Sequence, residues 1–145
     1  SSTLIKKVLR SLPTLVYFSF LKVPSTATAV LADRTLYVSG VLGLDKDSLK
    51  LVAGGAEPEA RKALSNLGHI LDAAGSKYEN VVKTTVMLND IADFAAVNSV
   101  YQECKRVFNG SNFPARSSYQ VGKLPLGAAV EIEVVALVGD VKTVA

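Results

Sequence analysis

Residues 130–138 read VEIEVVALV, and this stretch decides the fold class. Successive side chains of a β-strand point to opposite faces of its sheet. One face of this strand therefore receives Val130, Ile132, Val134, Ala136 and Val138. The other face receives Glu131 and Glu133, followed by Val135 and Leu137. Towards its C-terminal end the strand is apolar on both faces, so we expect both faces of its sheet to be covered.

Two helices are predicted earlier in the chain, over residues 58–74 and 93–108. Pro58 suits the first turn of the first helix, and Gly75 its C-terminal end. Its apolar residues recur at helical spacing: Ala60, Ala63, Leu64, Leu67, Ile70, Leu71 and Ala74. The second helix has one apolar face as well, made of Phe94, Val97, Val100, Tyr101, Cys104 and Phe108. Two helices are enough to cover only one face of a sheet.

The remaining apolar, β-branched runs predict strands over 15–20, 28–32, 35–39, 81–88 and 115–121, with Asp33-Arg34 as a two-residue turn. With 130–138 they make an α+β fold, a six-stranded mixed sheet with two helices on one face. We expect a single domain over 1–145, of which residues 1–28 are a divergent arm or first strand. The helix-free face is most simply buried against another subunit, which predicts a homo-oligomer.

The composition excludes several classes of function. The 145 residues hold one His and one Cys, too few for a zinc site or a disulfide framework within one chain. The net charge is +3, and no run of Lys and Arg is interleaved with aromatic residues, so a nucleic-acid partner is only weakly supported. No apolar stretch reaches the roughly 20 residues that a membrane span needs.

The N-terminal segment has two interpretations. Residues 1–32 contain no acidic residue, and Lys6, Lys7 and Arg10 precede an apolar run over 12–23, which is followed by an Ala-x-Ala at 27–29. These features are shared by targeting segments, mitochondrial ones included. The run LVYFSF over 15–20 equally suits a first strand. We expect a cytoplasmic protein, with a mitochondrial location as the alternative.

Arg116 is the first candidate for chemistry. It lies within the strand predicted over 115–121, where alternation places it on one face with Ser118 and Gln120. A guanidinium in that position needs a carboxylate. The carboxylate is either Glu131, in a structural ion pair between adjacent strands, or that of a substrate. His69 projects off its helix stripe and is expected in solvent, whereas Cys104 is expected in the core.

Five ordered motifs give the chain a resemblance to a known family. They are Tyr37-Val38-Ser39-Gly40, Asn80-Val81-Val82-Lys83-Thr84-Thr85-Val86, Asp93-Phe94-x-x-Val97-Asn98-x-x-Tyr101, Phe113-Pro114-Ala115-Arg116-Ser117 and Val130-Glu131-Ile132-Glu133. Over residues 29–145 the chain resembles the RidA/YjgF family. The resemblance implies a chorismate-mutase-like fold and a homotrimer with its sheets facing the centre and active sites in the clefts between subunits. It also implies a deaminase, without metal or cofactor, that hydrolyses reactive 2-imino acids such as 2-iminopropanoate and 2-iminobutanoate to 2-oxo acids and ammonia.

The same resemblance implies roles for particular residues. Arg116 would clamp the substrate carboxylate with the backbone N–H of Ser118, and Glu131 would hold and activate the attacking water. Ser39, Gly40 and Asn98 would line the pocket. Thr26 stands where the family has a pocket Tyr, which predicts weakened activity. The alternatives are an endoribonuclease and translation inhibitor acting on single-stranded RNA, and a non-catalytic trimer that binds small carboxylates or acts like a chaperone.

Overall fold

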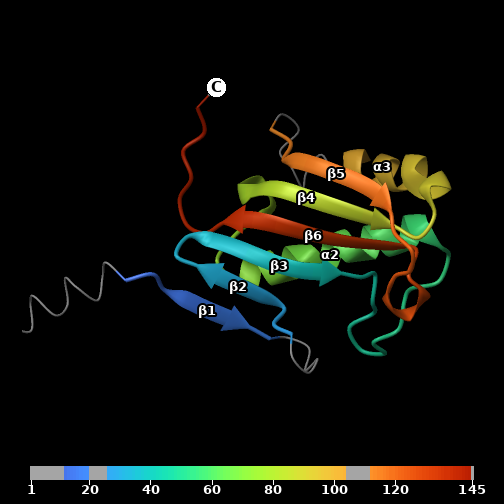
Figure 1. The fold of residues 1–145 in the computed structure, drawn as a ribbon, viewed down its shortest axis with the longest axis horizontal. Coiled ribbons are helices and arrows are strands. Elements are labelled where there is room, and N and C mark those ends of the chain that lie inside the picture. The colour runs from blue at the N-terminus through green and yellow to red at the C-terminus, as the bar shows by residue number, and fades with distance from the viewer. Residues whose placement is uncertain (1–11, 20–25, 104–111, 145) are drawn as a thin grey trace, which may run out of the picture.

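The computed structural model describes residues 12–19, 26–103 and 112–144, which form one sheet with two helices (Figure 1). The strands lie in the order β1-β2-β3-β6-β4-β5. Their bounds are β1 Leu15–Phe18, β2 Ala29–Ala32, β3 Thr35–Val41, β4 Val81–Leu88, β5 Ala115–Gln120 and β6 Val130–Leu137. Neighbouring strands are antiparallel except β4 and β5, which are parallel, so the predicted six-stranded mixed sheet is confirmed.

Both helices lie on the same side of the sheet, behind it in Figure 1. Helix α2 spans Ala56–Ala73, and helix α3 is described over Phe94–Glu103. The first helix starts two residues earlier than predicted, after Gly55, which leaves Pro58 inside the first turn, where its missing N–H removes no helical bond. The end predicted for the second helix, with Cys104 and Phe108, lies outside the described residues. No helix in the described ranges is both long enough and apolar enough to span a membrane.

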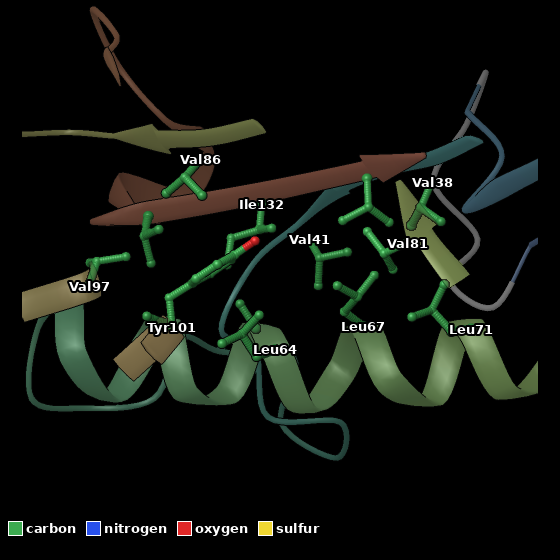
Figure 2. Close-up of a cluster of buried hydrophobic side chains, with 14 of the residues drawn as sticks. Val38, Val41, Leu64, Leu67, Leu71, Val81, Val86, Val97, Tyr101 and Ile132 are labelled. Atoms are coloured by element: carbon green, nitrogen blue, oxygen red, sulfur yellow. The ribbon is translucent and has the colours of Figure 1, made fainter. Parts of the chain in front are cut away.

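The core lies between the helices and the sheet (Figure 2). Leu64, Leu67 and Leu71 project from α2 towards the sheet, on the side where Ile132 of β6 lies, and Val134 of β6 belongs to the same core cluster. The inward face of β6 is almost wholly buried, as its alternation predicts. The core thereby fixes which face each residue of β6 presents, and so fixes the outward direction of Glu131.

The other face of the sheet has no helix over it. We call it the open face. Its apolar residues include Tyr17, Val30, Tyr37, Met87, Val135 and Leu137, and its polar and charged residues include Lys83, Thr85, Glu131 and Glu133. The tyrosines are well exposed, 66% for Tyr17 and 53% for Tyr37, and Val135 and Leu137 are half-buried. The single chain therefore leaves uncovered the second apolar face that the sequence of β6 predicts.

Gly43 is a place where close packing requires glycine. It is buried after β3, and a Cβ placed on it would lie 2.7 Å from Cα of Glu59 and 2.9 Å from its carbonyl carbon. These are backbone atoms of α2, so the helix itself would have to move. Gly43→Ala should lower the free energy of unfolding by about 1–3 kcal/mol, as overpacking does. Urea denaturation measures this.

The matched control for Gly43→Ala is Gly122→Ala. A Cβ on Gly122 meets nothing within 4 Å, and its backbone lies outside the left-handed region. Its substitution should change stability by less than about 0.5 kcal/mol. Equal stabilities for the two variants would contradict the close approach of α2 to Gly43.

Candidate functional site

Arg116 lies on the helix-covered face of β5, at the edge of the sheet. It pairs in register with the buried Thr84 of β4. Its guanidinium carbon lies 4.7 Å from the centre of the Tyr101 ring and 5.8 Å from that of Phe94. Aromatic faces attract a guanidinium without neutralising it. Within the described part of the chain Arg116 forms no ion pair, so its charge is available to a ligand.

Helix α3 supplies the two aromatic rings beside this arginine. Phe94, Asn98 and Tyr101 follow one another at i, i+4 and i+7, which places them along one side of the helix. The Tyr101 hydroxyl and the Thr84 hydroxyl share a hydrogen bond of 3.0 Å, which fixes the ring under Arg116. Burial raises the pKa of Tyr101, against smaller opposing effects of this hydrogen bond and of the Arg116 charge. The phenol is therefore neutral at physiological pH.

The backbone of β5 adds donors to the same place. Val121 N–H donates to the carbonyl of Leu88 on β4, at 2.9 Å. Because N–H groups alternate in direction along a strand, those of Ser118 and Arg116 point away from β4, towards the outer edge of the sheet. Ser118 also carries the one buried side-chain polar atom in the described residues that has no hydrogen-bond partner, its Oγ. We call Phe94, Asn98, Tyr101, Arg116 and Ser118 the arginine set.

Glu131 lies on the open face of β6, opposite Met87 of β4. Partial burial raises the pKa of its carboxyl, and the negative charge of Glu133 raises it further. Its neighbour on β3 is Gly40. The Glu131 carboxylate lies on the side of Gly40 where any other residue would carry its Cβ. A proton acceptor with a raised pKa is suited to general base catalysis near neutral pH.

Ser39 precedes Gly40 and ties the chain before β2 to β3. Its hydroxyl donates to the carbonyl of Ala27 at 2.7 Å, and its N–H donates to that of Thr28 at 3.0 Å. The lone pairs of the Ser39 hydroxyl remain able to accept a hydrogen bond. We call Ser39, Gly40 and Glu131 the glutamate set.

The two sets lie on opposite faces of one sheet. Arg116 faces the helices, whereas Glu131 faces away from them, and strand β4 lies between β5 and β6. The structural ion pair predicted as one alternative, between adjacent strands, is therefore wrong. Its premise was that strands next to each other in sequence are neighbours in the sheet. A single chain does not bring the two predicted catalytic residues together.

The other sequence-based candidates can be placed as well. His69 is exposed on α2, as predicted. Thr26 is exposed before β2, and Tyr17 lies on β1, three strands from β6. At the usual spacing between strands this is about 14 Å, so Tyr17 does not replace the missing family Tyr beside Glu131 in the same chain.

The sequence interpretation missed Phe94 and Tyr101 as partners of Arg116. It assigned both to the apolar face of their helix, and Tyr101 is indeed 4% exposed. Their spacing with Asn98 was the available signal, because a polar residue at i+4 between two aromatic residues marks a side that is not simply core.

Comparison with known proteins places these features in a wider group. A family model described as "Endoribonuclease L-PSP" matches residues 24–138. The fruit fly "RutC family protein UK114" is 60% identical over 115 residues, which are 79% of this chain and 80% of that protein. The human "2-iminobutanoate/2-iminopropanoate deaminase" is 53% identical over 115 residues, 79% of this chain and 81% of that protein.

Solved structures share the fold. Yeast Mmf1 superposes with a TM-score of 0.78 at 32% identity, covering 87% of this chain and all of that one. TdcF of E. coli, crystallised with bound serine, gives a TM-score of 0.76 at 27% identity, covering 83% of this chain and 94% of that one. The chorismate-mutase-like α+β architecture is thereby confirmed.

Proposed function

This chain belongs to the endoribonuclease L-PSP (RidA/YjgF) family, and from that premise and the geometry above we propose that it hydrolyses small 2-imino acids, such as 2-iminopropanoate and 2-iminobutanoate, to 2-oxo acids and ammonia. The placement of Arg116 is the observation that carries the proposal. It is a guanidinium held over two aromatic rings at an exposed sheet edge, with outward N–H groups beside it. That arrangement suits a small carboxylate. The human relative that is named a deaminase and the relative that binds serine support the same class of ligand.

The site requires a second copy of the chain. Arg116 and Glu131 cannot reach one substrate from opposite faces of a sheet, but the β5 edge of one copy can meet the open face of another. The open face is apolar enough to be buried in this way. We propose a homotrimer in which each cleft takes the arginine set from one subunit and the glutamate set from the next.

The chemistry follows from these positions. Arg116 and the Ser118 N–H hold the carboxylate, which places the C=N carbon over the second subunit's Glu131. Glu131 takes a proton from a water molecule as the water oxygen bonds to C2, and this proton passes to the nitrogen. The hydroxyl on C2 then gives its proton to the same nitrogen through Glu131 as the C–N bond breaks, so ammonia leaves and C2 keeps the oxygen as a carbonyl. One water is consumed for each ammonia released.

Substitution of Arg116 tests the proposal. A coupled assay generates 2-iminopropanoate and follows the 2-oxo acid. Arg116→Ala removes charge-assisted hydrogen bonds of about 1.5–3 kcal/mol each, so kcat/KM should fall about 100-fold or more. Arg116→Lys keeps the charge but not the bidentate geometry and should recover only part of the activity. If wild type accelerates hydrolysis no more than Arg116→Ala does, the proposal fails.

The same preparations separate this activity from RNA cleavage. The family model carries an endoribonuclease description, whereas the sequence has no run of Lys and Arg interleaved with aromatic residues. Ribonuclease activity of this site should disappear in both Arg116→Ala and Glu131→Gln. Cleavage that persists equally in the two variants does not belong to this site.

A further inference from the structure

We propose that Gly40 is a positioning residue for Glu131, because the side chain that glycine lacks leaves the space in which the Glu131 carboxylate lies. This inference deepens the proposed function and rests on it. It gives Gly40 a role different from the lining of a pocket by its backbone. It also explains why a glycine interrupts a strand that is otherwise rich in β-formers.

The geometry around Gly40 is specific. The register of β3 with β6 shifts between Val38 and Val41, so Ser39 and Gly40 form an irregularity in the ladder. A Cβ placed on Gly40 would clash with Oε1 of Glu131 and would lie 2.5 Å from its Cδ and 2.9 Å from its Cγ. The nearest atoms all belong to this one side chain. The outer half of Glu131 therefore lies directly against the glycine.

Backbone conformation does not explain the glycine. Gly40 is absent from the described residues with left-handed φ, so alanine could adopt the same backbone there. Gly40 is also exposed, so a methyl group would not overfill the core. Gly54 and Gly55 differ, because both have positive φ. What Gly40 provides is room, and Glu131 is what fills it.

An alanine at position 40 would displace the Glu131 carboxylate from the place it occupies beside Gly40. The side chain of Glu131 can rotate away, so the fold tolerates the change, but the oxygen that holds the water moves by about an ångström. A misplacement of that size can cost about 100-fold in rate. Binding of the substrate carboxylate by Arg116, on the other subunit, is unaffected. The substitution therefore separates catalysis from binding.

Kinetics of Gly40→Ala test the inference. We expect kcat for 2-iminopropanoate to fall about 100-fold while KM changes less than about threefold. Gly122→Ala, where a methyl group meets nothing within 4 Å, is the matched control and should match wild type in both constants. An unchanged kcat in Gly40→Ala would overturn the inference.

Shortening the neighbour provides a second test. Glu131→Asp withdraws the carboxylate by one methylene, which removes the overlap with a Cβ at position 40. Gly40→Ala should therefore cost several-fold less in the Glu131→Asp background than in wild type, a coupling that a double-mutant cycle measures. If Gly40→Ala fails to fold, the double variant should fold. Failure of both, or equal losses in both backgrounds, would overturn the inference.

A readout without turnover separates this inference from the proposed function. In protein carrying ¹³C-labelled glutamate carboxyls, the titration of Glu131 should shift in Gly40→Ala and remain unchanged in Gly122→Ala. If the wild-type protein showed no deaminase activity, the proposed function would be refuted. The titration of Glu131 would still show whether Gly40 positions its carboxylate. An unshifted titration in Gly40→Ala would contradict the contact itself.

Discussion

Mixing Arg116→Ala chains with Glu131→Ala chains should restore deaminase activity that neither variant has alone. Arg116 and Glu131 lie on opposite faces of one sheet, so each proposed site takes the arginine from one subunit and the glutamate from the next. In a mixed trimer, an Arg116→Ala subunit still supplies an intact Glu131, and a Glu131→Ala subunit still supplies Arg116. With equal amounts and random assembly, about a quarter of the clefts receive both intact residues.

The expected recovery is therefore from near background to about a quarter of wild-type activity per site, after co-refolding to exchange subunits. The double variant Arg116→Ala/Glu131→Ala is the matched control, because mixing it with either single variant leaves no cleft with both residues. Chains mixed without exchange should also stay inactive. If exchanged mixtures show no recovery, Arg116 of one subunit and Glu131 of the next do not act in one site, and the shared cleft is wrong.

The parts of this fold that local patterns determine could be predicted. The alternation of Val130, Ile132 and Val134 correctly gave the buried face of β6, and the spacing of Leu64, Leu67 and Leu71 gave the buried face of α2. These patterns show which residues face the core. The core-facing residues can be predicted because side-chain direction repeats every two residues in a strand and about every 3.6 residues in a helix.

Strand order could not be predicted in the same way. Residues 115–120 and 130–137 are consecutive strands, but the crossover through α3 makes β5 parallel to β4 and leaves it at the edge. Nothing in the sequence of either strand states which neighbour it pairs with. The alternative of an Arg116–Glu131 ion pair failed for that reason. The pairing of Gly40 with Glu131 was hidden likewise, because it joins β3 to β6 across 91 positions of sequence.

Glu131→Gln should abolish most of the activity and, at neutral pH, make the protein more stable. Glutamine cannot accept the proton of the attacking water, and loss of a general base costs about 10²–10⁴-fold in rate. The stability effect follows from the raised pKa of Glu131, which burial and the charge of Glu133 produce. A carboxyl with a raised pKa in the folded state stabilises the fold while it is protonated, and that contribution is lost as pH rises through the folded pKa.

Thermal melts and rate profiles at acidic and neutral pH measure both effects. The Tm of Glu131→Gln should exceed that of wild type at pH 7, and the difference should shrink towards pH 4. In wild type, kcat/KM should rise with pH through a midpoint above the ordinary glutamate value of about 4.3. Equal Tm values for Glu131→Gln and wild type at pH 7 would contradict the burial cost.

The variant Glu133→Gln tests how much the charge of Glu133 contributes to the raised pH midpoint of kcat/KM. Glu133 is the titratable neighbour of Glu131 on the open face of β6, whereas Met87 on β4 and Ser39 and Gly40 on β3 do not titrate in this range. Lys83, further along β4, donates to the Ser117 hydroxyl instead.

Removing the Glu133 charge should lower the midpoint of the kcat/KM profile without lowering its plateau much. A midpoint that stays in place in Glu133→Gln but disappears in Glu131→Gln would assign the whole shift to burial. The proposed base, Glu131, therefore owes its raised pKa to burial and charge on the same sheet face that we propose a second subunit covers.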